Sequence, residues 1–447
     1  MSRKNKAIGV ESRSLFCVTF SIGEPTNTIG GAENMIGKPK TLAIVMSVLF
    51  IMAGCGGETE PEPSLQQSKE SPEQRSSPDV EPSFAAAEQQ FALDLFHEMM
   101  KKAGGSQNMF ISPYSVQQAL LMTANGAAGD SRKEILHALS IEQMDITSIN
   151  QSSRSLIQSY KTLPHGEFSA ANSIWSKPEL KKGFTDKIAG LGDAYQLNKD
   201  PQLAADEVNA WTAKKTGGHI DQIIDRVPPD TIAYIINAVF FKEYWKQPFD
   251  EKLTAPHPFY AADGSKKDHP MMTQTNRFSY QETKRFQAVK LPYKDDGLAL
   301  AVFLPKKTEN LQSLLKEWTY ENWRESQARW EMKQVELKLP RFSIDAEYVL
   351  NDPLKQLGLK TVFHQADFSN MFAGDPAGYI KEVKHHTFIK VDEAGTEAAA
   401  ATKVEIVESG AVPDVTMTVD HPFYFAVFDE KTGMILFLGS VAKPVEG

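Results

Sequence analysis

Histidines next to acidic or histidine neighbours are the side chains of this sequence with the clearest potential for chemistry. His97-Glu98 begins the pattern in which two helical histidines hold zinc and the glutamate acts as a general base. The second histidine of that pattern would stand at position 101, which is Lys101. His385-His386 lies in a strand-like run, where adjacent side chains face opposite sides and cannot chelate one ion. A buried, hydrogen-bonded histidine is the favoured interpretation there.

Other catalytic motifs are absent from the sequence. It has no Gly-x-Ser-x-Gly elbow, phosphate-binding loop or Gly-x-Gly-x-x-Gly fingerprint. Cys17 and Cys55, the two cysteines, both lie near the N-terminus. The rest of the chain therefore has no disulfide, thiolate metal site or cysteine nucleophile. We expect no enzyme, no catalytic residue, no metal and no cofactor. The net charge of -9, from 48 basic and 57 acidic residues, also argues against a nucleic-acid partner.

The most informative stretch is residues 389–408. From Thr396 to Val407, alternate residues form two faces. The residues of the first face are small or apolar, and the second face carries all the charges. The first face is Thr396, Ala398, Ala400, Thr402, Val404 and Ile406, and the second is Glu397, Ala399, Ala401, Lys403, Glu405 and Val407. This alternation is typical of a half-buried strand. An exposed helix also fits, because alanine, glutamate and lysine favour helix. The pattern alone leaves open a helix, a static strand and a segment that becomes a strand.

The elements that must position this stretch are mostly helices early in the chain and strands later. Helices are predicted from Phe84, from the Ser112-Pro113 cap to Asn125-Gly126, and from Asp130. Strands are predicted at residues 233–241, 287–291, 298–304 and 335–339, followed by a hairpin over 423–441. This order predicts an α+β fold, with N-terminal helices packed on large, mostly antiparallel sheets.

The N-terminal region has the features of an export signal. Lys38 and Lys40 precede an apolar run, residues 42–53, which is shorter than the about 20 residues of a membrane-spanning helix. Residues 52–55 resemble a bacterial lipobox, which implies lipidation of Cys55. A plain secretory signal cut nearby is the alternative.

The chain is predicted to divide into three parts. Residues 1–55 are the signal region, of which residues 1–34 look like upstream sequence before a better initiator at Met35. Residues 56–83, rich in Glu, Ser, Pro and Gln, are expected to be a disordered tether, and residues 84–447 to be the folded domain. The protein is expected to cross the inner membrane and to be lipid-anchored at the cell envelope or extracellular. Cys55 would be its sole link to the membrane.

Residues 393–401 carry the pattern Glu-x-Gly-Thr-Glu-Ala-Ala-x-Ala, which resembles the hinge and reactive loop of the serpin family of protease inhibitors. Segments elsewhere agree with that family in order and spacing. Residues 108–115 resemble its shutter, and residues 237–242 with Trp245 resemble the strand that leads to its breach. The resemblance implies the serpin fold, with an exposed reactive-centre loop.

The resemblance also implies roles for individual residues. The loop hinge would consist of Glu393, Gly395, Thr396, Glu397, Ala398, Ala399, Ala400 and Ala401. The shutter and breach would include Ser112, Ser115, Asn237, Trp245 and His385, with His385 hydrogen-bonded to Asn237. We expect Gly395 to let the backbone turn at the hinge.

The implied mechanism is suicide inhibition. A target endopeptidase attacks the loop and forms its acyl-enzyme, and the cut loop then enters the main sheet as an extra strand. Insertion drags the protease along and distorts its active site. The small residues after Gly395 would enter without steric or desolvation penalty. A non-inhibitory serpin acting as carrier or chaperone is the alternative, as is a ligand-binding surface lipoprotein.

The scissile bond is expected near Ser409-Gly410, with Glu408 to Ala411 as candidates. Small residues there favour elastase-like or subtilisin-like serine proteases, whereas a cut after Glu408 would indicate a glutamate-preferring enzyme. Cysteine proteases are also compatible with the loop. The protein is expected to act as a monomer.

Overall fold

The computed structural model describes residues 75, 77–218, 221–228, 231–374, 378–396 and 412–446, apart from the side chains of residues 169, 171, 237, 238 and 381. Several predicted features fall outside this part of the chain and stay predictions. They are Cys55, the start at residues 1–34, most of the tether, the hinge residues Glu397 to Ala401, and the scissile-bond candidates Glu408 to Ala411.

Helices precede most of the strands along the chain. The larger ones are α1 (Pro82–Ala103), α2 (Pro113–Gly126), α3 (Gly129–Ala138), α4 (Ile146–Lys161) and α6 (Pro201–Lys215). Shorter ones are α5 (Lys182–Ile188), α7 (Leu311–Leu315), α8 (Tyr320–Gln327), α9 (Asn351–Gln356), η1 (Glu251–Leu253) and η2 (Thr361–Phe363). The predicted cap of α2 is confirmed, because the Ser112 side chain accepts the backbone N–H of Ser115 and proline occupies the first turn.

A six-stranded sheet within the described residues contains the start of the predicted hinge. Its order is β10 (Phe342–Val349), β11 (Ile380–Val391), β12 (Gly395–Thr396), β4 (Ala233–Tyr244), β2 (Glu167–Ser176) and β3 (Asp193–Gln196). β4 and β11 are parallel and pair directly from Ala233 to Val239 of β4. Near the C-terminal ends of these two strands, the two-residue β12 stands between them and pairs with both.

The other sheet has nine strands in the part of the chain that the structure describes. Its order is β1 (Met109–Ile111), β15 (Ile435–Val441), β14 (Phe423–Asp429), β8 (Leu298–Pro305), β7 (Phe286–Pro292), β6 (Lys266–Glu282), β9 (Glu331–Pro340) and β13 (Val415–Thr418), with β5 (Ala255–Tyr260) paired to β6. Its pairs are antiparallel except β9 with β13. β8, β14 and β15 are buried along their whole length, as their continuous apolar runs predict.

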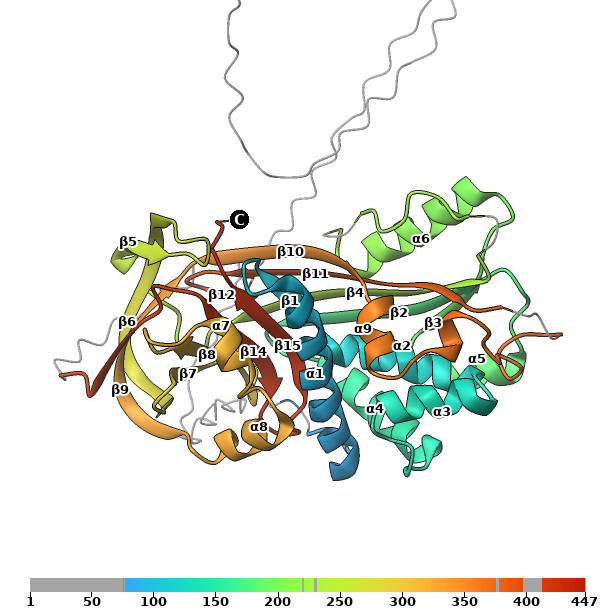
Figure 1. Cartoon of the computed structure of the whole chain (residues 1–447), viewed down its shortest axis with the longest axis horizontal. Helices are drawn as coiled ribbons and strands as arrows, with labels where there is room; N and C mark the ends of the chain where they lie inside the picture. The colour runs from blue at the N-terminus through green and yellow to red at the C-terminus, as the bar shows by residue number, and fades with distance from the viewer. Residues whose placement is uncertain are drawn as a thin grey trace, which may run out of the picture. The chain divides into compact units, whose positions relative to one another are not determined.

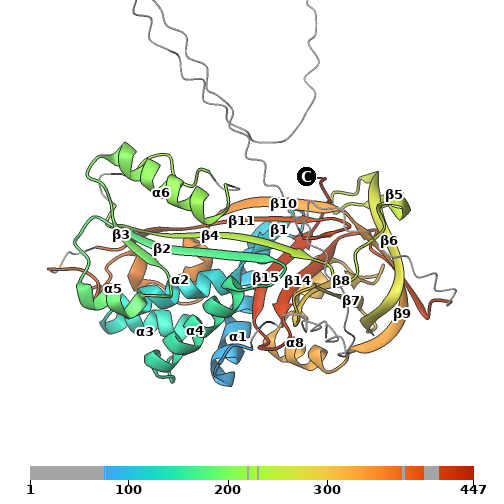
Figure 2. The ribbon, with the colours of Figure 1, turned by 180° about the vertical axis from the view of Figure 1, so that it is seen from behind.

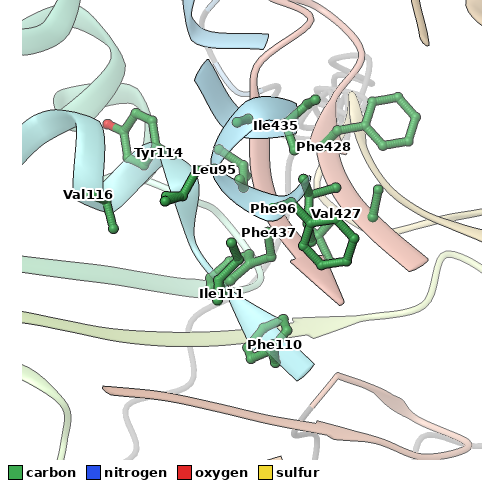
Figure 3. Packing of buried hydrophobic residues seen from close by; sticks show 14 of the residues in the cluster. Leu95, Phe96, Phe110, Ile111, Tyr114, Val116, Val427, Phe428, Ile435 and Phe437 are labelled. Atoms are coloured by element: carbon green, nitrogen blue, oxygen red, sulfur yellow. The ribbon is translucent and has the colours of Figure 1, made fainter. Parts of the chain in front are cut away.

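The helices lie on both faces of the six-stranded sheet. α6 covers one face, and α2 to α5 lie on the opposite side (Figures 1 and 2). Trp211 and Val208 of α6 pack with Trp175 and Ile236 of the sheet in a small apolar cluster. The main core is formed where α1 and α2 meet β14 and β15, with Phe96, Phe110 and Phe437 among its buried side chains (Figure 3).

The predicted α+β class, with early helices on large and mostly antiparallel sheets, is confirmed. The folded unit begins earlier than residue 84, because α1 starts at Pro82 and Arg75 is already buried in an ion pair with Asp429. Across the described residues, no helix combines the length and the apolar character needed to span a bilayer.

Candidate functional site

The hinge begins with a tight turn between β11 and β12. The backbone N–H of Asp392 donates to the carbonyl of Gly395 over 2.9 Å. The Asp392 carboxylate accepts the N–H of Ala394 over 3.0 Å, a local bond that aspartate often makes in turns. The turn reverses the chain at the end of β11 and directs it back along that strand. Residues 395 and 396 therefore enter the sheet antiparallel to both of their neighbours.

Gly395 is required by close approach of two backbones rather than by a turn. It pairs with Tyr244, and a Cβ at position 395 would lie 2.0 Å from the carbonyl oxygen of Glu243. Gly395 is not among the glycines with positive φ, so the expected role in turning the backbone is wrong. Any side chain here would push β12 away from β4.

Thr396 is the residue of β12 that pairs with both β11 and β4. It is fully buried and pairs with Val391 on one side and Glu243 on the other. Its hydroxyl is 2.7 Å from that of Tyr293, so the buried polar group has a partner. This position explains why a small hydroxyl residue fits, since the site offers one hydrogen-bond partner and little space.

Trp245, the predicted breach residue, lies against this turn. Its backbone N–H donates to the carbonyl of Ala394, and its indole Nε1–H donates to the carbonyl of Asp392, each over 2.9 Å. Its ring stacks on Tyr293, with centroids 4.7 Å apart and planes inclined by 9°. Trp245 thus connects the end of β4, the hinge turn and the partner of Thr396.

Glu393 is held by an ion pair that sequence reasoning missed. Its side chain is 6% exposed, and its carboxylate accepts Nη2 and Nε of Arg341 over 2.7 and 2.8 Å. The hydrogen bond to Glu393 raises the pKa of Arg341 above its usual value. The two residues are 52 positions apart, and the sequence carries no signal that would pair them. The pair fixes the turn from the side of β10.

The predicted shutter residues meet deeper in the molecule. The N–H of Ser112 donates to Nε2 of His385 over 2.9 Å, and Ser112 Oγ donates to the carbonyl of Leu436 over 2.8 Å. Ser115 Oγ is 3.4 Å from Oδ1 of Asn172. Burial lowers the pKa of His385 to about 3, so the imidazole is neutral and can accept at Nε2. These bonds connect α2 to β11, β15 and β2.

Asn237 lies opposite both His385 and Asn172 in the strand register. The expected bond from His385 to Asn237 involves a side chain outside the described residues and stays a prediction. Nε2 of His385 accepts the backbone N–H of Ser112. His386 points the other way, to Asp345 at 2.6 Å, so the expectation that the two histidines face opposite sides is confirmed.

This arrangement can extend a strand. Continuing β12 beyond Thr396 would replace the direct β4–β11 pairing, which runs from Thr387↔Val239 down to Ile380↔Ala233. A new strand would satisfy its own backbone groups on both sides. Among the described residues, no group of three or more His, Cys, Asp or Glu side chains is placed to hold a metal ion.

The fold and this partly formed strand define a class, and the chain belongs to the serpin family. The family model described as Serpin (serine protease inhibitor) matches residues 86–444. The resemblance seen in the sequence is thereby confirmed. Members of this family are in general inhibitors of proteases rather than enzymes.

Relatives of this chain occur in organisms as different as Thermococcus kodakarensis and Bos taurus. An uncharacterised serpin-like protein of Thermococcus kodakarensis is 32% identical over 438 residues, covering 91% of this chain and 100% of the relative. The leukocyte elastase inhibitor of Bos taurus is 29% identical, covering 80% of this chain and 99% of that protein. The crystal structure of the thermophilic serpin tengpin in its native state matches with a TM-score of 0.76 at 27% identity, covering 82% of this chain and 96% of tengpin.

Proposed function

We propose that this protein is an inhibitory serpin that traps serine endopeptidases as a suicide substrate. The observation that carries the proposal is Thr396, already buried between β4 and β11 and paired with both. The residues that follow and are predicted to face inward on insertion, Ala398 and Ala400, are small. Such side chains enter a closing sheet without a desolvation penalty, which favours insertion over hydrolysis of the acyl-enzyme.

The proposed targets are elastase-like or subtilisin-like proteases. The candidate bonds between Glu408 and Ala411 offer small residues and one glutamate, with no arginine or lysine. Shallow specificity pockets accept such residues. The bovine relative named leukocyte elastase inhibitor supports this choice.

Incubation with elastase, subtilisin and trypsin, followed by denaturing electrophoresis, tests the proposal. We expect a covalent complex that survives SDS with elastase or subtilisin and none with trypsin. Mass spectrometry of the C-terminal fragment would identify the bond that is cut. Cleavage within residues 397–411 without a complex, across the whole panel, would instead indicate a carrier or a plain substrate.

We further propose that Cys55 anchors the exported protein to a membrane, and that translation starts at Met35. The tether before the folded unit would keep the loop accessible to proteases outside the cell. Mass spectrometry of the mature protein from its native host tests both points. An unmodified mature chain that begins away from Cys55 would contradict the anchor.

A further inference from the structure

Two buried carboxyl groups lie together beneath the hinge. Glu243 is fully buried at the end of β4, directly opposite Thr396 in the β12–β4 pairing. Asp295, in the loop between β7 and β8, is buried as well. Neither residue belongs to the hinge, shutter or breach positions that the sequence predicted.

Both carboxyl groups pack against Gly166, in the loop that precedes β2. The Asp295 carboxylate accepts the N–H of Gly166 over 2.9 Å and the N–H of His165 over 3.1 Å. Glu243 Oε2 fills the space above the same glycine, since a Cβ at Gly166 would lie 1.9 Å from this oxygen. Glu243 Oε1 accepts the N–H of Tyr244 over 2.9 Å, whereas Oε2 has no hydrogen-bond partner among the described residues.

The two carboxyl groups are expected to share one negative charge and to retain one proton. Two ionised carboxylates in a buried site repel each other, so such a pair retains a proton. The Asp295 carboxylate accepts two backbone N–H groups, whereas Oε2 of Glu243 accepts none. Burial and then the neighbouring Asp295 raise the pKa of Glu243 to about 9. The proton therefore resides on Glu243, whose neutral carboxyl lies beside Asp295.

The elements around Glu243 bring several other titratable or charged side chains. They are His165 before β2, Tyr293 and Lys294 after β7, and Asp392 and Glu393 in the hinge turn. Glu393 is already paired with Arg341, and Asp392 caps its own turn. Asp295 is the charged group that acts on Glu243, and its effect is to keep Glu243 neutral.

We propose that Glu243 is a positioning residue for loop insertion, in which its protonated carboxyl, packed beside Asp295, holds the end of β4 where Thr396 enters between β4 and β11. The consequence for inhibition rests on the function proposed above, but the local effect does not. Any opening that exposes Glu243 to water releases its proton. That opening therefore becomes more frequent as the pH rises from the ordinary glutamate pKa towards the raised one.

Hydrogen–deuterium exchange of the free protein tests the local effect in the absence of a target protease. After correction for intrinsic exchange, opening of the peptide that covers the end of β4 should increase up to about tenfold per pH unit between pH 6 and 9. Glu243→Gln, whose neutral amide cannot release a proton, should have a flat profile. Glu251→Gln, at an exposed glutamate of η1, should behave as wild type. A flat wild-type profile would overturn the proposal.

The stoichiometry of inhibition tests the consequence. If β4 is held less firmly, insertion slows and more inhibitor is cleaved without trapping the protease. The stoichiometry of inhibition is measured for wild type and Glu243→Gln with the same protease at every pH. The ratio of the wild-type stoichiometry to that of Glu243→Gln should rise about threefold or more from pH 6 to 9. A constant quotient would contradict the role in insertion. Absence of any covalent complex at every pH would contradict the inhibitory function alone, since the exchange result stands independently.

Discussion

The hydroxyl groups of Thr396 and Tyr293 are 2.7 Å apart, at the place where the predicted reactive loop first enters the sheet. Tyr293 is fully buried and stacks on Trp245, so its hydroxyl is held in a fixed position. The bond joins the hinge to the loop that follows β7, outside the six-stranded sheet. It therefore holds β12 in place at Thr396.

Replacing Tyr293 with phenylalanine should loosen this contact. The change leaves the buried Thr396 hydroxyl without its partner, at a cost of about 1–3 kcal/mol. We expect a lower thermal midpoint and faster cleavage of residues 397–411 by proteases that the protein does not trap. Tyr260→Phe, at an exposed ring, is the matched control. Equal behaviour of both variants would show that the bond contributes nothing.

Thr396→Arg should convert an inhibitor into a substrate. Arginine at this fully buried position would place a charge inside the sheet during insertion, a penalty of several kcal/mol. We expect cleavage of the loop without an SDS-resistant complex. Thr275→Arg, on the exposed side of β6, should leave complex formation unchanged. Undiminished inhibition by Thr396→Arg would refute insertion at this position.

Arg341→Ala should destabilise the hinge turn. Glu393 would remain buried with its main charge partner removed, although Arg341 is itself 35% exposed, which reduces the penalty to about 1–3 kcal/mol. Arg341→Lys keeps the charge but loses the two-point contact, so it should recover part of the effect. The thermal midpoint and hydrogen–deuterium exchange at residues 392–396 measure this destabilisation. A lysine variant as unstable as the alanine variant would mean that charge plays no part.

The shutter should make stability sensitive to acid. In the unfolded chain His385 binds a proton below about pH 6.5, whereas burial keeps it neutral in the native protein down to about pH 3. Its contribution is therefore complete above pH 6.5 and is lost as the pH falls, by up to about 1.4 kcal/mol per unit. Unfolding midpoints of His385→Gln between pH 7 and 5 should change less than those of wild type. His386→Gln, on the opposite face, should retain the wild-type slope.

Arg75 should matter for stability although it precedes the first helix. Its ion pair with Asp429 is fully buried, and its guanidinium lies 5.2 Å from the ring centre of Tyr160. Arg75→Ala would leave Asp429 buried without this cation, at a cost of about 3–5 kcal/mol. Lys133→Ala, which breaks an exposed pair with Asp130, should cost less than about 1 kcal/mol. Similar unfolding midpoints for both variants would contradict this role.

Local signals in the sequence predicted the elements well. The cap at Ser112 and the hairpin after Phe423 follow from neighbouring residues, and both were found. The sequence pattern located the hinge, but the role predicted for Gly395 was wrong. The close approach of Gly395 to the Glu243 carbonyl depends on how three strands meet, which no sequence pattern predicts.

Contacts between distant segments could not be predicted. Arg341 and Glu393, or Thr396 and Tyr293, meet only because β10, β11 and the loop after β7 converge. Glu243 illustrates the limit most clearly. It follows an apolar run in a strand and has no sequence signal of its own, and its proton depends on Asp295, 52 positions later.

The placement of β14 and β15 determines what a protease would leave behind. Both strands follow the loop in sequence, yet they lie inside the nine-stranded sheet, between β8 and β1. A cut within residues 397–411 would separate the chain into two polypeptides without separating the molecule. The shorter polypeptide would stay bound as part of the core and elute with its partner under native conditions. Only denaturation would reveal it as a separate chain.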